Sequence, residues 1–505
     1  MTTPGLPAGT DAETLHSSTS DERRFLKNIS WTSLSMVLRV GFAGGALAIL
    51  GRLVEPGTMG LYGMGWTAAL VGFTISQSGA AQGIIALPKL EKEHVAAAQF
   101  LSAVISLAIA AVIIISAPAI QAFYHFPHLS MAFVIAGIFV PLMSLPAVDV
   151  ALAQKELQFS RLAVVQTGGV VLAAITALIL AHLGRGLIAL FALQGLVGPF
   201  TFVLFRFYRR SPGFGRTSWR HTTDVWRIGI HLSLSSLTTV AWQSVPQLVL
   251  GKMVTVEALG LYVYSYRIVQ IVFNQLSSMV NTVVYPSFAR YRSDPVLVGR
   301  SFLRTVRFTY FCLMLPMIAL AAAPGSFLRA YGGAKWAAAD GILFYLVLMQ
   351  MAISLGANVF PTFMALGRPE VTWQWNLFIT VVQSASILVT AHWGILAVIK
   401  GLAVSAWVMA LAVYWLSKAA QFRFIDYWRS MAPLIGYLPP SIALGEGIQH
   451  LIGKNHAIES FVVSSFAAVL LYVSLMLTTD RQAKQLLQEG TRVLRSRLLS
   501  DGARA

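Results

Sequence analysis

Charged residues are scarce in this chain, making up 11% of its 505 residues, whereas hydrophobic residues make up 56%. An ordinary soluble domain carries about 25% charged residues. So little polar surface excludes a water-soluble fold. Because a helix satisfies its own backbone hydrogen bonds within hydrocarbon, the composition predicts an all-α integral membrane protein.

Cysteine is almost absent, and the sequence lacks the common catalytic motifs. Cys312 is the only cysteine and lies in an apolar run, which excludes disulfides and a cysteine-based metal site. We find no Walker, HExxH or GxSxG pattern, and the ten histidines show no ligand spacing with an acidic partner on one helix face. The sequence therefore predicts no enzyme, with no catalytic residues, no cofactor and no metal.

Acidic residues number only 20 against 37 Lys and Arg, which gives a formal charge of +17. Nucleic-acid binders gather such charge on one soluble face or helix, whereas here it lies in short connections between apolar runs. Excess Lys and Arg in short connections is typical of the cytoplasmic loops of membrane proteins. We expect membrane lipids and no nucleic acid as partners.

Apolar runs broken by proline, glycine and charge predict about fourteen transmembrane helices. They lie near residues 30–50, 62–86, 96–120, 131–152, 162–182, 186–205, 228–250, 260–284, 305–323, 338–366, 371–391, 393–416, 431–450 and 459–478. With the N-terminus inside, the inner segments hold 28 of the Lys and Arg and the outer loops 6. This bias predicts that both termini are cytoplasmic.

A short repeat divides the spans into two sets. GRLVEPGTMGLY at residues 51–62 matches GKMVTVEALGLY at residues 251–262, at a constant offset of 200 residues. A parallel repeat after six spans indicates two six-helix bundles related by an axis along the membrane normal.

The predicted domains follow from this division. They are a cytoplasmic tail (1–29), an N-lobe (30–205), a basic cytoplasmic linker (206–227), a C-lobe (228–416), two further spans (417–478) and a cytoplasmic amphipathic tail (479–505). A second inner segment, 290–307, is as basic as the linker. The basic residues of both segments can orient the neighbouring helices in the membrane and contact anionic lipid headgroups. The alternative is that these segments bind a partner protein.

The charged residues inside predicted spans include Arg39, Asp149, Arg267 and Lys400. Each costs about 2.5 to 3.5 kcal/mol at the centre of a span, so such residues usually face a bundle interior or a hydrated cavity. Three cations in a cavity suit an anionic group such as a phosphate. The alternative for the cations is helix packing or snorkelling, and Asp149 fits an inner gate near Lys155 and Arg161 or a site of ion coupling.

Polar and small residues also recur within the spans. Gln166 and Asn358 could line a cavity or join helices through hydrogen bonds, and both interpretations stay open. Gly41 and Gly45 form a GxxxG pattern, which weakly indicates close helix packing.

Several stretches resemble the polysaccharide transporter (Wzx-like, WzxC-type) family of the multidrug/oligosaccharidyl-lipid/polysaccharide (MOP) flippase superfamily. They are RLVEPGTMGLYGM with IIALPKLEKEH, ALAQKELQFSRLAVVQ with LAHLGRGLIAL, MVNTVVYPSFARYRSDP, YGGAKWAAADGIL and FMALGRPEV. Each is moderately specific alone, and their order and spacing make the resemblance.

The resemblance implies two six-helix lobes in a V shape plus two C-terminal helices, in a bacterial inner membrane. It implies alternating-access flipping of an undecaprenyl-diphosphate-linked oligosaccharide, alongside polymerase and chain-length proteins. Arg39 and Arg267, with Lys400, would bind the diphosphate. The sequence departs from the family at Gln154, Lys155 and Glu156, where LQR-F is common. A drug/cation antiporter, a peptidoglycan-precursor flippase and a membrane polymerase or ligase remain alternatives.

Overall fold

The computed structural model describes residues 35, 38–87, 90–156, 158–208, 219–289, 294–368, 370–453 and 456–479, and their regular elements are all helical. The predicted tail 1–29 and the amphipathic segment after residue 479 lie outside the described residues. The chain divides into two compact units. Unit 1 comprises Met1–Leu53 and Met64–Val240, and unit 2 comprises Val54–Gly63 and Ala241–Ala505.

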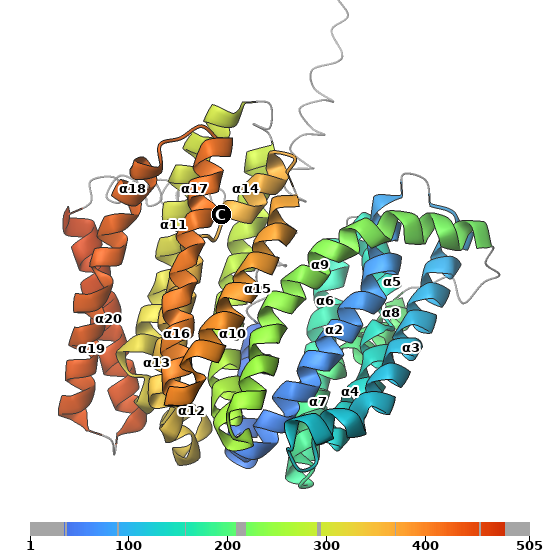
Figure 1. The fold of residues 1–505 in the computed structure, drawn as a ribbon, viewed down its shortest axis with the longest axis horizontal. Helices are drawn as coiled ribbons and strands as arrows, with labels where there is room; N and C mark the ends of the chain where they lie inside the picture. The colour runs from blue at the N-terminus through green and yellow to red at the C-terminus, as the bar shows by residue number, and fades with distance from the viewer. Residues whose placement is uncertain are drawn as a thin grey trace, which may run out of the picture. The chain divides into compact units, whose positions relative to one another are not determined.

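Unit 1 is built from long helices, several of which are broken in two. Residues 38–53 are helical, and there follow α2 (Pro56–Ala86), α3 (Lys92–Tyr124), α4 (Leu129–Ser144), α5 (Ala147–Lys155), α6 (Phe159–His182), α7 (Gly186–Gly195), α8 (Val197–Tyr208) and the first part of α9 (Trp219–Met253). Helix α3 packs along α4, and α6 packs against α7 and α8 (Figure 1). The backbone turns by 44° between α7 and α8.

Unit 2 contains the remaining helices. They are α10 (Val256–Ala289), α11 (Pro295–Ala322), α12 (Pro324–Gly332), η1 (Ala334–Ala339), α13 (Asp340–Ser354), α14 (Val359–Ala365), α15 (Glu370–Thr390), η2 (Ala391–Trp393), α16 (Ile395–Ser405), η3 (Ala406–Val408), α17 (Met409–Ala419), α18 (Phe424–Gly436), α19 (Leu438–Ile452) and α20 (Ala457–Thr479). Helices α19 and α20, red in Figure 1, run side by side and both pack on α11.

The predicted all-α membrane architecture is confirmed. The described part of each predicted span lies on one helix or on consecutive helices. Seven of the described segments are long and apolar enough to cross a membrane, or eight if the bent pair α7 and α8 forms one span. Helices such as α9 carry too many polar residues to pass this test, so the count of fourteen stays a prediction.

The boundaries of the two basic segments differ from the prediction. Helix α11 begins at Pro295, not near residue 305, because the Asp294 carboxylate accepts hydrogen bonds from the backbone N–H groups of Val296 (2.9 Å) and Leu297 (3.1 Å). An aspartate cap followed by proline at the first helical position is a strong start signal. Arg300, Arg304 and Arg307 therefore lie on a helix. Between α8 and α9 only residues 209–218, which are outside the described range, separate the helices.

The sequence repeat is also a structural repeat. In unit 2, a Cβ built on Gly60 would overlap the carbonyl oxygen of Val256, and one built on Gly260 would overlap that of Pro56. The two contacts are related by the same offset of 200 residues, so the start of α2 crosses the start of α10 symmetrically. By contrast, Cβ positions on Gly41 and Gly45 meet no described atom within 4 Å. The GxxxG pattern does not mark close packing among the described residues.

An ion pair in unit 2 agrees with the predicted alternation of loops. Glu55, just before α2, lies 3.4 Å from the Lys335 ammonium in η1. Both residues fall in loops predicted to be on the outer side, at 51–61 and 324–337, and their contact places the two loops at one end of the unit.

Candidate functional site

Arg39 lies in the first helix of unit 1 and is partly buried. Its Nη1 donates a hydrogen bond of 2.9 Å to Oε1 of Gln166 in α6, and its Nε donates to the carbonyl oxygen of Ser35 at 3.4 Å. Two predicted span residues are thereby brought together. The amide orients the guanidinium without neutralising it, because Gln166 carries no charge, so Arg39 keeps a positive charge that can attract an anion.

Arg267 lies on α10 in unit 2, surrounded by tyrosines. Its guanidinium carbon is 5.2 Å from the centre of the Tyr62 ring. Tyr262 and Tyr266, one turn apart on α10, stack at 5.7 Å beside this pair. Aromatic faces hold a cation through the ring quadrupole and leave its charge in place. Tyr62, whose ring contacts the Arg267 guanidinium, was not predicted as a site residue, although Tyr62 and Tyr262 are matched residues of the repeat.

Side-chain amides follow Arg267 along α10. Gln270 Nε2 donates to Gln350 Oε1 of α13 at 3.4 Å. Gln350 is fully buried and lies in a part of unit 2 where amides also join helices: Asn358 Nδ2 donates to Thr309 Oγ1 of α11 at 2.8 Å. Of the two interpretations for Asn358, the hydrogen bond between helices is the one that the structure shows.

Lys400 is exposed on α16. Its ammonium lies 5.1 Å from the centre of the Tyr345 ring of α13. The structure therefore gives Lys400 a cation–π partner within unit 2 and leaves its surface accessible, which fits either a snorkelling cation or one that meets an anion.

Asp149 is 6% exposed, on the short helix α5, among a cluster of apolar side chains. The two cations near it in sequence form hydrogen bonds with other groups. Lys155 Nζ donates to the carbonyl oxygens of Ile84 (2.8 Å) and Leu87 at the end of α2, and Arg161 Nη1 donates to Gln158 Oε1 (3.0 Å). Lys155 thus stabilises the C-terminal carbonyls of α2, which is a favourable place for a cation.

A mainly apolar recess of about 210 Å³, with a few polar side chains in its lining, lies in unit 1 between α3, α4, α5 and α8. Its lining includes Gln99, Ser102, Ser144, Val148 and Arg206. Among the described residues, Gln99 Oε1 and Ser102 Oγ are buried without hydrogen-bond partners. Buried polar atoms of this kind are normally satisfied by water, and the recess is large enough to hold several molecules. Val148, which precedes Asp149 in the sequence, is among the residues that line this recess.

Comparison with known proteins identifies the relatives of this chain. It is similar to the teichuronic acid biosynthesis protein TuaB of Bacillus subtilis (25% identical, covering 54% of this chain and 57% of that protein) and to the lipopolysaccharide biosynthesis protein WzxC of Escherichia coli (20%, covering 72% and 74%). The match to the succinoglycan biosynthesis transport protein ExoT of Rhizobium meliloti is 21% identical and covers 96% of this chain and 99% of that protein.

The fold has solved counterparts. The inward closed conformation of the lipid II flippase MurJ superposes with a TM-score of 0.72 at 12% identity, over 90% of this chain and 99% of that one. An inward-facing multidrug resistance MATE transporter of the MOP superfamily gives 0.55 at 17% identity, over 76% and 98%. At such identities the likeness concerns the fold alone. The profile of the polysaccharide biosynthesis protein family matches residues 49–340, and the chain belongs to that family.

Proposed function

We propose that this protein flips undecaprenyl-diphosphate-linked oligosaccharide repeat units across a bacterial inner membrane by alternating access, for polysaccharide biosynthesis. The observation that carries the proposal is the similarity to ExoT, a named transport protein, over nearly the full length of both chains. The MOP fold supports it, since members of this superfamily are flippases and transporters. Both termini would be cytoplasmic, and polymerase and chain-length proteins would act on the flipped product.

The cations within the helices provide the chemistry for an anionic lipid carrier. The Arg39 guanidinium donates a hydrogen bond to Gln166, and the Arg267 guanidinium lies over the Tyr62 ring. A guanidinium can form two parallel hydrogen bonds to a phosphate, and each charge-assisted bond contributes about 1.5 to 3 kcal/mol. We propose that these two residues bind the diphosphate, with Lys400 as a third, exposed cation.

Asp149 is the proposed residue for gating or ion coupling. Its carboxyl group is buried on a short helix whose Val148 borders the recess of unit 1. A buried carboxyl group that can be reached by water can exchange a proton or bind a cation, whereas a fully dry one cannot. Export by an Asp149→Asn variant at the wild-type rate, over a range of membrane potentials and pH values, would contradict this role.

The fold by itself leaves the cargo open, because MurJ and MATE transporters share it. A drug/cation antiporter would use carboxylates within its spans, and the sequence offers one clear candidate, Asp149. A peptidoglycan-precursor flippase would also need cations for a diphosphate. The relatives named for teichuronic acid, lipopolysaccharide and succinoglycan favour a polysaccharide precursor over both alternatives. We propose no enzymatic reaction for the chain.

Deletion and complementation in the strain of origin test the function. The deletion strain should lose the exported polymer and accumulate the lipid-linked repeat unit, and the wild-type gene should restore export. Arg39→Ala and Arg267→Ala should lower export at least tenfold at equal protein in the membrane, because each removes a charge-assisted phosphate contact. The Lys variants at both positions should retain more export than the Ala variants.

Two controls separate anion binding from packing. Arg185→Ala removes an exposed cation in the connection before α7, and it should export normally. Gln166→Leu removes the hydrogen-bond partner of Arg39 but keeps the charge of Arg39, so export should fall less than in Arg39→Ala if that charge binds the anion. Full export by both Ala variants would overturn the diphosphate role but not the transport function, which the deletion strain tests.

A further inference from the structure

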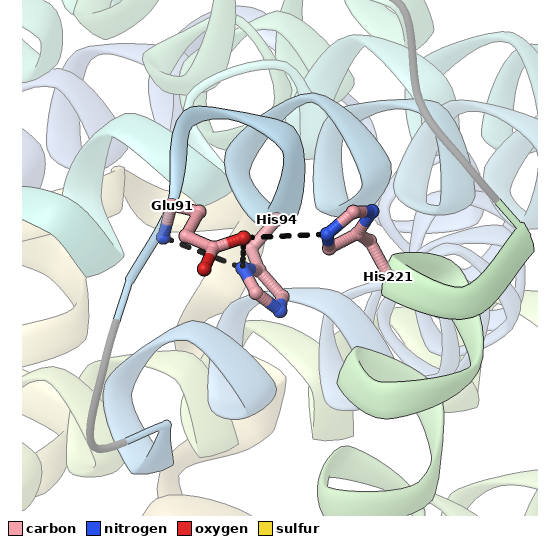
Figure 2. A group of neighbouring side chains, drawn as sticks. All are labelled: Glu91, His94 and His221. Carbon is pink, nitrogen blue, oxygen red and sulfur yellow. Dashed lines mark hydrogen bonds and ion pairs between the residues drawn. The ribbon is translucent and has the colours of Figure 1, made fainter.

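Three side chains that can bind a metal meet at one end of unit 1. Glu91 and His94 lie at the start of α3, and His221 lies in the first turn of α9 (Figure 2). Glu91 Oε2 is 3.3 Å from His221 Nε2 and 3.9 Å from His94 Nδ1. One ligand atom from each residue lies within 4.8 Å of those of the other two.

Local structure holds these residues in place. Glu91 precedes the first helical residue of α3 with an extended backbone (φ −99°, ψ 160°), and its N–H donates to His94 Nδ1 at 3.3 Å. His94 is buried, and its ring meets that of His221 edge to face at 4.7 Å between centroids, as Figure 2 shows. The two rings and the carboxylate therefore converge, although α3 and α9 are far apart in the sequence.

The spacing of the three atoms is close to that of a tetrahedral metal site. Zn²⁺ binds imidazole nitrogen and carboxylate oxygen at about 2.0 to 2.2 Å, which puts neighbouring ligand atoms about 3.4 Å apart. The contact of Glu91 with His221 already has this length, and its contact with His94 is longer by about half an ångström. The ligand atoms of the two histidines lie within 4.8 Å of each other, so the rings would have to approach by up to about 1.4 Å on binding the ion.

We propose that Glu91, His94 and His221 form a binding site for Zn²⁺. Two imidazoles and one carboxylate are borderline ligands that suit Zn²⁺, Co²⁺ and Ni²⁺, whereas Mg²⁺ and Ca²⁺ prefer sites built from oxygen. Three protein ligands leave a fourth position for water. The bound ion would fasten the first turn of α9 to the start of α3. This inference concerns a site apart from the span residues and does not depend on the cargo.

Two features determine the expected affinity of this site for Zn²⁺. A Zn²⁺ ion that binds His94 Nδ1 displaces the hydrogen bond that this nitrogen accepts from the Glu91 N–H. His221 Nδ1 is buried and has no hydrogen-bond partner among the described residues, so no group there orients the ring. A partner on the second nitrogen typically raises metal affinity about 10- to 100-fold. We therefore expect affinity in the micromolar range, below that of closed structural zinc sites.

The chain offers a matched control in unit 2. His456 Nδ1 lies 3.3 Å from Glu459 Oε2 at the same i,i+3 spacing as Glu91 and His94, and both side chains are exposed. Among the described residues no third ligand joins this pair. A His456→Gln variant thus removes a histidine beside a glutamate without touching the proposed site.

The test is metal binding to the purified full-length protein in detergent, prepared with a histidine-free tag and freed of metal with a chelator. A Cys312→Ala background removes the only thiol. Calorimetry should show one Zn²⁺ bound per chain and none of comparable affinity for Mg²⁺. Co²⁺ should give the intense visible absorption of a tetrahedral complex, and X-ray absorption on the zinc form should show two imidazole ligands.

The variants decide the assignment. Affinity should fall at least tenfold in His94→Ala, His221→Ala and Glu91→Gln, and stay unchanged in His456→Gln. Glu91→Gln keeps the size of its side chain, so it remains informative if a histidine variant is unstable. The absence of saturable Zn²⁺ binding, or equal affinity in the wild type and the two histidine variants, would overturn the proposal.

Discussion

Gly260→Ala should destabilise the protein, because the new methyl group has no space. Its Cβ would overlap the Pro56 carbonyl oxygen and lie 3.1 Å from Gly60 N, so both obstacles are backbone atoms that cannot rotate away. Forcing extra carbon into a packed contact costs about 1 to 3 kcal/mol. Alanine returns about 1 kcal/mol of helix propensity. With a rigid obstacle the cost lies near the upper limit, which leaves a net loss of about 2 kcal/mol.

The loss can be measured as a fall in Tm of the detergent-purified protein. Gly60→Ala should behave like Gly260→Ala, since it meets the carbonyl oxygen of Val256 in the symmetric contact. Gly41→Ala and Gly45→Ala are the controls: their Cβ positions are open to 4 Å among the described residues, so Tm should stay or rise. The Tm of the Gly60→Ala, Gly260→Ala double variant should fall by less than the sum of the two single falls, because one displacement of the helices relieves both overlaps.

A Tm for Gly260→Ala equal to that of the Gly41→Ala control would refute the close crossing of α2 and α10. Additive losses at positions 60 and 260 would instead show two independent contacts.

Two further changes test individual hydrogen bonds by the same Tm measurement. Asp294→Ala removes the cap of α11 and should lower the stability by about 1 kcal/mol, whereas Asp294→Asn keeps an acceptor and should lower it little. Equal losses in the two variants would mean that the hydrogen bonds accepted by the cap contribute nothing to the stability. Tyr427→Phe leaves the buried Leu355 carbonyl without its 2.8 Å donor and should cost about 1 to 3 kcal/mol, whereas Tyr414→Phe, on an exposed ring, should be neutral.

The sequence predicted the helices well because hydrocarbon imposes one strong rule on span length and polarity. It misplaced the start of α11, where Arg300 and Arg304 looked like loop residues. Charge ended the apolar run near residue 305, but the backbone continues as a helix back to Pro295, where Asp294 caps it. Hydropathy marks where a chain can lie in hydrocarbon, whereas capping marks where a helix begins.

The candidate residues could be predicted individually, but their partners could not. A charge within an apolar run is visible in the sequence, so Arg39 and Arg267 were found without a structure. Gln166 and Tyr62 reach them through folding, from distant parts of the chain. The prediction that no histidine has a ligand spacing with an acidic residue missed Glu91 and His94, which lie three residues apart at the start of α3. His221, the third residue of the proposed metal site, belongs to another helix and is brought to them only by folding.

The mutual contact of Gly60 with Val256 and of Gly260 with Pro56 has the form of an interface between two identical chains. In such a two-fold contact, residue i of one copy meets residue j of the other, and j meets i. Within unit 2, the two copies of the repeat therefore meet as two copies of one chain would, each glycine making room for the backbone of the other copy.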